Sequence, residues 1–459
     1  MSKFKTTVIF LISAESSDTR IFSELLMQDL LQTKSNTEVA IIVIQDTVDP
    51  RLDDNNNLKL CWQIEYDEQQ QKKIKTPVPQ INFRNLGSSE DLTDVLNKIK
   101  SNFEAERYIL FNWGHGFGFG IFNNKDKENN KLRANINVEN NIRAVDLANE
   151  SPANFIKIIS SKKPQQSNFL QLAQFNSNTL LNDGIDINQI NIQEINPDET
   201  DMLTMEELNV AIEQSITKVG VLLMLNCWMQ SLETAYSLRS TVEYLVAPET
   251  VFNWNGYDYV KIIDVIIDDP YISNEKIAEI AVDSVPDKYR NLQRPESLSE
   301  VVLSAVCVEG CVERVAGFVN ELSQSIMSYD IEGIADLKKT RRNVLHELSH
   351  EYIEEGKLPI YFTDLFTALK NVVTHEGILK NLKDEIEKKY VGKRILIGDK
   401  FNKDGNKTAY GFSVYFPNDD FYIDKSQYYK KFYLNNSPKQ ISFAKNNNWG
   451  GFIQAFNTY

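Results

Sequence analysis

The first quarter of the chain alternates short apolar runs with amphipathic stretches. Residues 6–12 and 38–44 are continuous runs rich in β-branched side chains, which are typical of strands covered on both faces. Residues 19–31 and 92–103 have helical periodicity, and a third strand is expected over residues 108–112. Because strands and helices alternate, the sequence predicts an α/β fold in which helices cover a mostly parallel central sheet.

A long polar segment interrupts this alternation. Residues 123–201 are rich in Asn, Gln, Lys and Asp, and an insertion of this length in a compact domain is usually functional or mobile. Regularity returns with a helix over residues 205–214 that Thr204 caps, a fourth buried strand over 219–225 and a helix over 229–239. These elements continue the α/β pattern beyond the insertion.

The chain changes character after about residue 260. Helical periodicity dominates there, and a strand-like segment over residues 410–416 follows near the end. We therefore expect a first domain over residues 1–260 and a mainly helical C-terminal region with terminal strands over residues 261–459. The helices expected in this second region cover residues 275–285, 298–327, 340–355 and 362–373.

The acidic balance limits the classes of partner. The formal net charge is −15, so nucleic acid or an anionic membrane would repel the chain, and neither is expected as a partner. No stretch reaches the roughly 18 apolar residues that span a bilayer. The apolar run over residues 8–14 follows Lys3 and Lys5 as in a short signal peptide, but the polar residues 15–18 favour a buried strand instead. We therefore expect a cytoplasmic protein.

The strongest local feature is a histidine at the end of a strand. The segment Tyr108-Ile-Leu-Phe-Asn-Trp-Gly-His115-Gly116 runs from a buried strand into a Gly-His-Gly turn. Catalytic groups of open parallel sheets sit outside the carboxyl ends of the strands, and glycines let the backbone approach a reacting group closely. A histidine with no chemical role in a glycine-rich loop is the alternative, because a catalytic base must also satisfy geometry.

A cysteine occupies the same kind of position. Cys227 follows the strand predicted from residue 219, and a helix begins just beyond it, so nearby backbone N–H groups would favour the thiolate. A single cysteine is more often a small buried hydrophobe. Here a cysteine and a histidine each end a strand of one predicted sheet, which suits a nucleophile and its base. The chain has four cysteines, which do not suggest a disulfide framework: Cys61, Cys227, Cys307 and Cys311.

Five segments in order resemble the clostripain family of cysteine peptidases. The segment Leu225-Asn-Cys227-Trp-Met229-Gln-Ser-Leu-Glu233-Thr-Ala-Tyr-Ser-Leu-Arg239 is similar to the family's Asp-Ala-Cys-Leu-Met followed by a Glu-x-Ala-Tyr-x-Leu helix. Residues 411–417, Gly-Phe-Ser-Val-Tyr-Phe-Pro, are similar to Gly-Leu-Ser-Ile-Tyr-Phe-Pro of the family. The other three matching segments are residues 85–92, 244–249 and 256–259.

The resemblance implies a caspase-like α/β sandwich and a cysteine endopeptidase that acts on a protein or peptide substrate. By position, it makes Cys227 the nucleophile and His115 the proton-transfer residue of a His–Cys dyad. The backbone N–H groups of Gly116 and Cys227 would form the oxyanion hole. No cofactor is expected; clostripain-type enzymes can depend on calcium, but nothing in the sequence locates a site. A regulatory protein partner is compatible with such an enzyme.

Two positions depart from the family pattern. Leu225 stands where the family usually has an aspartate that helps to bind a basic P1 side chain, and Gly114 replaces an aspartate that commonly precedes the histidine. Leucine cannot pair with a guanidinium, so cleavage after arginine or lysine would need another acid. The S1 candidates are therefore Leu225 itself and Asp258.

The insertion has a possible role in activation. Family members are often activated by cleavage between the histidine and cysteine strands, and residues 123–201 lie at that place. Lys131, Arg133 and Arg143 are candidate sites for a basic-specific cut. A loop without any role in activation explains the same composition.

Two other functions stay open. His346-Glu347-Leu-Ser-His350 matches the H-E-x-x-H zinc signature, although the metzincin continuation is missing. A zinc peptidase that acts through His346, Glu347 and His350 is therefore a competing hypothesis. The other alternative is a pseudo-peptidase, which would bind a peptide or protein in the cleft that held the substrate of an ancestral enzyme. The presence of both dyad residues argues against this alternative.

Two smaller patterns have structural interpretations. Cys307 and Cys311 have helical i, i+4 spacing and are expected to face the core as a pair. The segment Asn402-Lys-Asp404-Gly-Asn406 is similar to a calcium loop, but Lys400 and Gly411 occupy its first and twelfth positions. A hairpin turn fits that segment better.

Overall fold

The structure is a computed structural model of the full chain. It describes residues 4–14, 17–48, 57–83, 85–116, 118–123, 201–249, 252, 256–290, 301–327, 362–365, 369, 380–381, 384, 390–397, 411–416, 431–434, 437 and 439–458.

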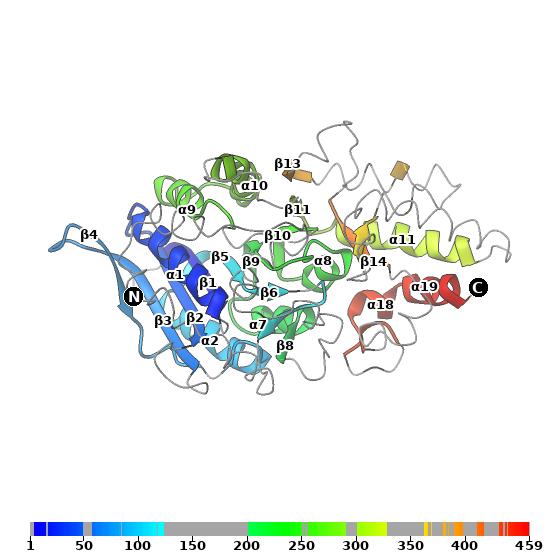
Figure 1. The fold of residues 1–459 in the computed structure, drawn as a ribbon, viewed down its shortest axis with the longest axis horizontal. Helices are drawn as coiled ribbons and strands as arrows, with labels where there is room; N and C mark the ends of the chain where they lie inside the picture. Colours follow the sequence, from blue (N-terminus) through cyan, green and yellow to red (C-terminus); the bar gives the residue numbers. More distant parts are fainter. Residues whose placement is uncertain are drawn as a thin grey trace, which may run out of the picture.

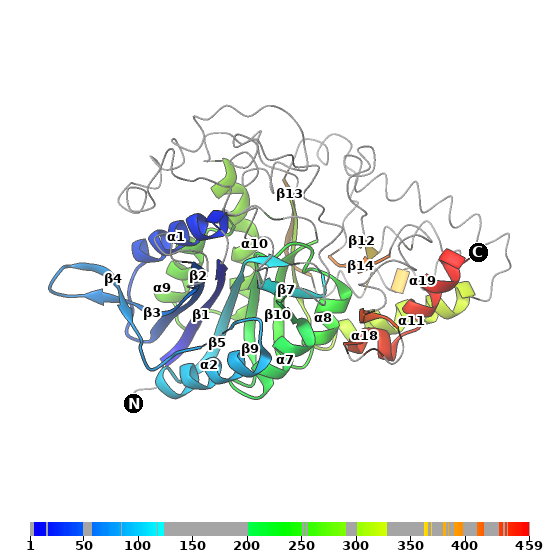
Figure 2. The same cartoon turned by 60° about the horizontal axis from the view of Figure 1, so that its bottom comes forward.

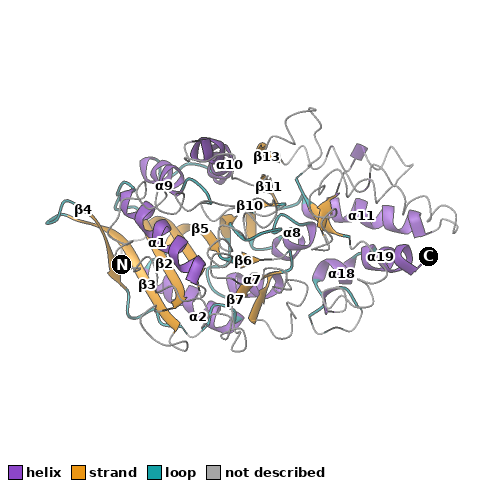
Figure 3. Ribbon diagram, viewed as in Figure 1, coloured by secondary structure: helices purple, strands orange, loops and turns teal. Residues whose placement is uncertain are grey.

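A nine-stranded mixed sheet forms the centre of the molecule (Figures 1 and 3). Its five middle strands are parallel to one another. On each side two more strands follow, and each of these pairs antiparallel with the strand before it. In spatial order the strands are β13 (Tyr390–Ile397), β11 (Val301–Cys307), β10 (Val242–Pro248), β9 (Val219–Met224), β5 (Ala105–Trp113), β1 (Phe4–Ala14), β2 (Val39–Val48), β3 (Asn57–Asp67) and β4 (Lys72–Pro77).

Helices cover both faces of this sheet, as Figure 2 shows. One face packs against α1 (Ser17–Gln32), α9 (Tyr259–Asp268) and α10 (Asn274–Arg290), and the other against α2 (Ser89–Asn102), α7 (Met205–Glu213), α8 (Leu232–Leu238) and α11 (Val312–Met327). Successive side chains of a strand point to opposite faces, so Phe10 of β1 joins the first apolar core and Leu11 joins the second. The predicted α/β fold with a mostly parallel sheet is confirmed.

Two small sheets and two terminal helices complete the described fold. β6 (His115–Gly116), β7 (Gly120–Asn123) and β8 (Asp201–Thr204) form a three-stranded antiparallel sheet, and β12 (Phe362–Asp364) pairs with β14 (Ser413–Tyr415). Asn123 and Asp201 are register partners, so both ends of the long insertion are joined in one sheet. α18 (Ser442–Asn446) and α19 (Trp449–Thr458) lie beside α8 and α11 at one end of the long axis (Figure 1).

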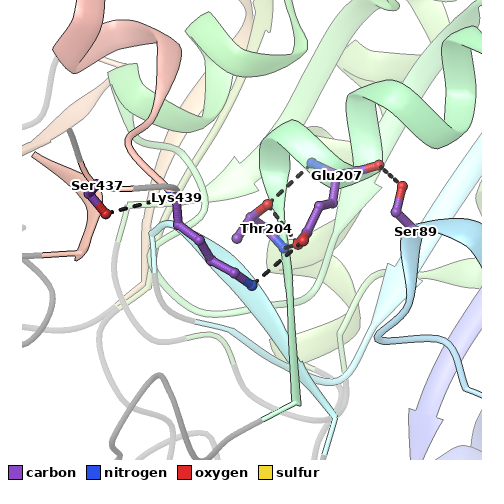
Figure 4. A network of polar contacts seen from close by, with 5 residues as sticks. All are labelled: Ser89, Thr204, Glu207, Ser437 and Lys439. Atoms are coloured by element: carbon purple, nitrogen blue, oxygen red, sulfur yellow. Dashed lines mark hydrogen bonds and ion pairs between the residues drawn. The ribbon is translucent and has the colours of Figure 1, made fainter.

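The capping box predicted at Thr204 starts α7. Thr204 Oγ1 accepts a hydrogen bond from the Glu207 N–H at 3.2 Å, and the Thr204 N–H donates to Glu207 Oε2 at 2.8 Å (Figure 4). Ser89 Oγ donates to the Glu207 carbonyl at 3.0 Å, and Lys439 Nζ lies 3.6 Å from Glu207 Oε1. Glu207, at the start of α7, thus connects Ser89 of α2 and Lys439 to Thr204, the last residue of β8.

Two helix predictions in the second region are wrong. Residues 301–307 form strand β11 and only residues 312–327 are helical, because the run Val-Val-Leu-Ser-Ala-Val extends the buried sheet beside β10. The start of the helix expected over residues 362–373 is strand β12. Cys307 therefore ends a strand and is partly exposed, whereas Cys311 is buried just before α11, so the two do not face the core as a helical pair.

The remaining predictions for this region have different outcomes. The division at residue 260 stays a prediction, although β10 before it and β11 after it pair directly in one sheet. The H-E-x-x-H segment at His346 and the loop around Asp404 lie outside the described residues. So do the candidate cleavage sites at Lys131, Arg133 and Arg143.

Candidate active site

The histidine and the cysteine lie just beyond the ends of two neighbouring parallel strands, at the same distance along the chain from one register pair. Asn112 of β5 is the register partner of Met224 of β9, and His115 and Cys227 each lie three residues after a member of this pair. Parallel strands end at the same edge of a sheet, so the two residues leave it side by side. The Leu225 N–H donates to the Asn112 carbonyl at 2.9 Å and extends the pairing toward them.

Asn226 ties the two chain segments together beyond the strands. Its Nδ2 atom donates to the carbonyl oxygens of Gly114 at 3.1 Å and of His115 at 3.2 Å. Asn226 is fully buried. The residue before the cysteine therefore bonds directly to the backbone of the histidine. A role for Asn226 was not predicted from the sequence, in which its one signal is a polar amide where the family motif has alanine.

Glycines on both sides of His115 permit this close approach. Gly114 has a φ of +151°, and a Cβ there would lie 3.0 Å from Cβ of Ser13 at the end of β1. A Cβ on Gly116 would lie 2.6 Å from Cβ of Asn226. A side chain at either position would force neighbouring atoms apart. The His115 side chain itself is exposed to solvent.

Cys227 is partly exposed as a residue, whereas its thiol is buried. Burial raises the pKa of its thiol to about 11, while the backbone N–H groups of Phe252 and of Cys227 itself act to lower that pKa. Phe252 follows β10, so the next strand of the sheet also contributes to the surroundings of the sulfur. Trp228 has a φ of +58°, a left-handed conformation that costs an ordinary residue about 1–2 kcal/mol.

Helix α8 holds the loop that follows the histidine. Ser231 caps the helix by accepting a hydrogen bond from the Thr234 N–H at 3.0 Å. Ser231 Oγ donates to the Gly118 carbonyl at 3.1 Å, and Thr234 Oγ1 donates to the same oxygen at 2.8 Å. The helix that starts just after Cys227 thus fixes the loop that starts at His115.

The two S1 candidates lie in different surroundings. Leu225 is 2% exposed and belongs to the core under α9, where a Cβ added to Gly256 would lie 2.5 Å from Leu225 Cδ1. Asp258 caps α9, its Oδ1 accepting from the Lys261 N–H at 3.1 Å. Their contacts give Leu225 a packing role and Asp258 a capping role. A role for either in substrate binding stays a prediction.

Two features of the described residues bear on other functions. Within them, no group of three or more His, Cys, Asp or Glu side chains is placed to hold a metal ion. This absence does not test the expectation that the protein has no cofactor. It does not test the calcium site that the family could imply either. No helix in the described part of the chain is long and apolar enough to cross a membrane.

Comparison with protein families identifies the chain. A model of the clostripain family matches residues 154–456, about two thirds of the sequence. The chain belongs to the clostripain family. The predicted resemblance is confirmed, and the family is one of cysteine peptidases. No curated protein matches the sequence.

Solved structures of clostripain-family proteases have the same fold. A secreted C11 cysteine protease from Bacteroides thetaiotaomicron, "iotapain", has a TM-score of 0.55 at 11% identity, with 90% of this chain and 94% of that chain covered. An inactive zymogen C11 protease from Parabacteroides distasonis has a TM-score of 0.54 at 14% identity, with 93% and 98% covered. At such identities the likeness establishes the fold of this clostripain-family chain.

This comparison contradicts the expected cytoplasmic location. The Bacteroides thetaiotaomicron neighbours are secreted proteases. The expectation rested on residues 8–14, which do form a buried strand, β1. A buried first strand serves a secreted protein as well as a cytoplasmic one, so the correct structural prediction did not support the conclusion about location.

Proposed function

We propose that this clostripain-family chain is a cysteine endopeptidase in which Cys227 is the nucleophile and His115 the proton-transfer residue. One observation carries the proposal. The two residues follow adjacent parallel strands in equivalent register, and Asn226 joins their backbones. A nucleophile and a base from separate parts of the chain are thereby held at one edge of the sheet, as covalent catalysis requires.

The raised pKa of Cys227 explains why a base is needed. With a pKa of about 11, only about one thiol in 10⁴ is ionised at pH 7. The surroundings of the sulfur therefore do not produce a stable thiolate on their own. A proton acceptor that acts during attack removes this obstacle, and His115 is the residue that the loop geometry offers.

The proposed reaction proceeds through an acyl-enzyme. His115 takes the Sγ proton as the sulfur attacks the peptide carbonyl, and the backbone N–H groups of Gly116 and Cys227 accommodate the oxyanion. His115 then gives the proton to the leaving amine as the C–N bond breaks. Water, deprotonated by His115, attacks the thioester; the C–S bond breaks, releasing the carboxylic acid and restoring the thiol.

A peptide substrate follows from this chemistry. One Bacteroides thetaiotaomicron neighbour was solved in complex with an irreversible peptide inhibitor, which supports a peptide as the substrate of this chain. An apolar P1 preference fits Leu225, whereas a basic preference would require an acid such as Asp258 in the pocket. Profiling cleavage over a peptide library distinguishes these two preferences.

The decisive experiment removes the sulfur. Cys227→Ala and His115→Ala are each expected to lower kcat/KM on a peptide library by at least about 10³-fold, because nucleophile and base act as one unit. Cys307→Ala is the matched control, since Cys307 is also partly exposed but pairs opposite Tyr244 at the amino end of β10. An electrophilic peptide probe is expected to label Cys227 and spare Cys307. Wild-type turnover by Cys227→Ala would end the assignment.

Activation by cleavage within residues 123–201 is the second part of the proposal. The intact mass of the wild-type protein, compared with that of Cys227→Ala, is expected to show fragments only when the nucleophile is present. Cuts after Lys131, Arg133 or Arg143 would further indicate a basic P1 preference. Identical intact masses for both proteins would exclude self-cleavage.

A further inference from the structure

Residues 411–415, which include β14, run along the segment that follows Cys227. The Gly411 carbonyl accepts from Gln230 Nε2 at 3.2 Å, and the Ser413 N–H donates to the Gln230 carbonyl at 2.9 Å. The Tyr415 N–H donates to Glu233 Oε1 at 2.8 Å. Every second residue of this C-terminal segment is therefore bonded to the chain just beyond the proposed nucleophile.

Glu233 is the charged member of this set and is deeply buried, with 1% of its surface exposed. Its Oε1 atom accepts two hydrogen bonds, from the Tyr415 N–H and from the Tyr433 hydroxyl. Among the described residues its Oε2 atom has no hydrogen-bond partner, and no lysine, arginine or histidine pairs with it. A buried acid without a counter-charge is costly, so packing alone does not explain a glutamate here.

The elements packed around Glu233 supply few ionisable groups. From the C-terminal part, Tyr433 presents its hydroxyl and Tyr415 stacks on the Tyr433 ring, 5.2 Å between centroids. Burial raises the pKa of Glu233 to about 7, and the bonds from Tyr433 and Tyr415 oppose that shift. At the N-cap of α8, Ser231 also acts to lower the pKa of the Glu233 carboxyl.

The position of Glu233 in α8 connects these contacts to the proposed dyad. Ser231 and Thr234, its near neighbours in the first turn, both hold the Gly118 carbonyl of the histidine loop. The same turn begins at Leu232, five residues after Cys227. One helical turn thus meets the cysteine segment, the histidine loop and the C-terminal strand, and a displacement of that turn would move Cys227 relative to His115.

We propose that Glu233 is a positioning residue for the peptidase reaction, which fastens residues 411–415 to the first turn of α8 and so fixes Cys227 against His115. The inference rests on the proposed function, because it assigns a role within the same site. Replacing the Glu233 carboxylate with a neutral amide would weaken its bond from the buried Tyr415 N–H, because charge-assisted hydrogen bonds are about twice as strong as neutral ones, so the strand would shift. A misplacement of about 1 Å at reacting groups can cost about 10²-fold in rate.

The test measures kcat and KM separately for two variants and two matched controls. Glu233→Gln keeps the shape and removes the ionisable group, and Tyr433→Phe removes only the hydroxyl. Glu243→Gln and Tyr108→Phe make the same changes at the amino end of the sheet, where Glu243 accepts from Asn274 and the Tyr108 hydroxyl accepts from the Ala105 N–H. Circular dichroism confirms that each variant is folded.

We expect both site variants to lower kcat by about 10-fold or more while KM stays within about twofold. Both controls are expected to keep the wild-type kcat. The ratio of wild-type kcat to Glu233→Gln kcat is expected to rise about threefold or more from pH 6 to pH 8, because only a carboxylate forms charge-assisted bonds. A glutamate that served only to stabilise the fold would leave this ratio unchanged.

The outcomes separate the two proposals. If the wild type hydrolyses peptides in a Cys227-dependent way but both variants keep its kcat, or the ratio is independent of pH, the positioning role is wrong and the peptidase assignment stands. If the wild type shows no Cys227-dependent hydrolysis, the proposed function fails and this inference fails with it. Should Glu233→Gln not fold, Tyr433→Phe decides the question by its kcat.

Discussion

Gly116 and Asn226 set how closely the proposed base and nucleophile can approach. The van der Waals space between them is already filled, since a Cβ on Gly116 would lie 2.6 Å from Asn226 Cβ and 3.3 Å from Met229 Sδ. Asn226 at the same time bonds to the His115 carbonyl. An added methyl group would therefore push apart the two segments that carry the dyad.

Gly116→Ala is expected to lower kcat/KM by at least about 10-fold, because it displaces Cys227 from His115. It is also expected to lower the free energy of unfolding by about 1–3 kcal/mol through overpacking. Gly317→Ala is the control, since nothing lies within 4 Å of a Cβ at that helical position. That variant is expected to be about 0.5–1 kcal/mol more stable and fully active. Peptide hydrolysis and urea unfolding measure both effects; equal activities in the two variants would contradict the tight contact.

Glu233 makes stability depend on pH in a defined direction. Its pKa is raised from 4.5 to about 7 by burial, so between these values the folded chain holds a proton that the unfolded chain has lost. The free energy of unfolding therefore falls as the pH rises through this window, by about 3 kcal/mol in total, and levels off above pH 7. Glu233→Gln is expected to match the wild type near pH 4 and to exceed it in stability at pH 8. Urea unfolding of both proteins from pH 4 to pH 8 measures this; a constant difference would contradict the raised pKa.

At the scale of elements, the local hydrophobic pattern predicted the middle strands of the sheet but not β11 near one edge. β1, β2, β5 and β9 are continuous apolar runs, and each lies where the sequence placed it. β11 was expected to be part of a helix because its apolar residues run into an amphipathic stretch with helical periodicity. Its strand conformation depends on pairing with β10. Pairing between segments that are distant in the sequence cannot be recognised from the residues of one short segment.

The residues of the candidate site also differ in how well the sequence predicts them. His115 and Cys227 could be found because each ends a strand with a recognisable pattern. The role of Glu233 could not, because its partners Tyr415 and Tyr433 are far away in the sequence and become neighbours only in the folded chain. The family motif includes both the Glu233 helix and residues 411–417, but sequence alone did not show that these two segments touch.

For the whole molecule, the long insertion joins elements that are already paired. Its two ends, Asn123 and Asp201, are register partners in the small sheet, and β5 before it pairs with β9 after it. The chain on either side is therefore held by sheet hydrogen bonds and a shared apolar core. We therefore expect the two parts to stay together without the covalent link through residues 124–200.

A cut in the insertion is expected to leave the molecule intact under native conditions. A recognition sequence for a specific protease, placed within residues 124–200 of Cys227→Ala, allows the cut to be made without self-cleavage. The two fragments are expected to elute together at the uncut volume in size-exclusion chromatography and to separate on a denaturing gel. Elution of two separate fragments would contradict this, and uncut Cys227→Ala with the same insertion is the control.

The contact between residues 411–415 and α8 also orders events during synthesis. Both members of the proposed dyad are translated well before β14, which follows Cys227 by about 180 residues. At about 5–20 residues per second, the ribosome needs roughly 10–40 s to cover that distance. A nascent chain therefore carries its nucleophile for many seconds before the strand that steadies it has been made. From the proposed role of Glu233, the chain is expected to reach its full rate of hydrolysis only after β14 has been made and has paired with the first turn of α8.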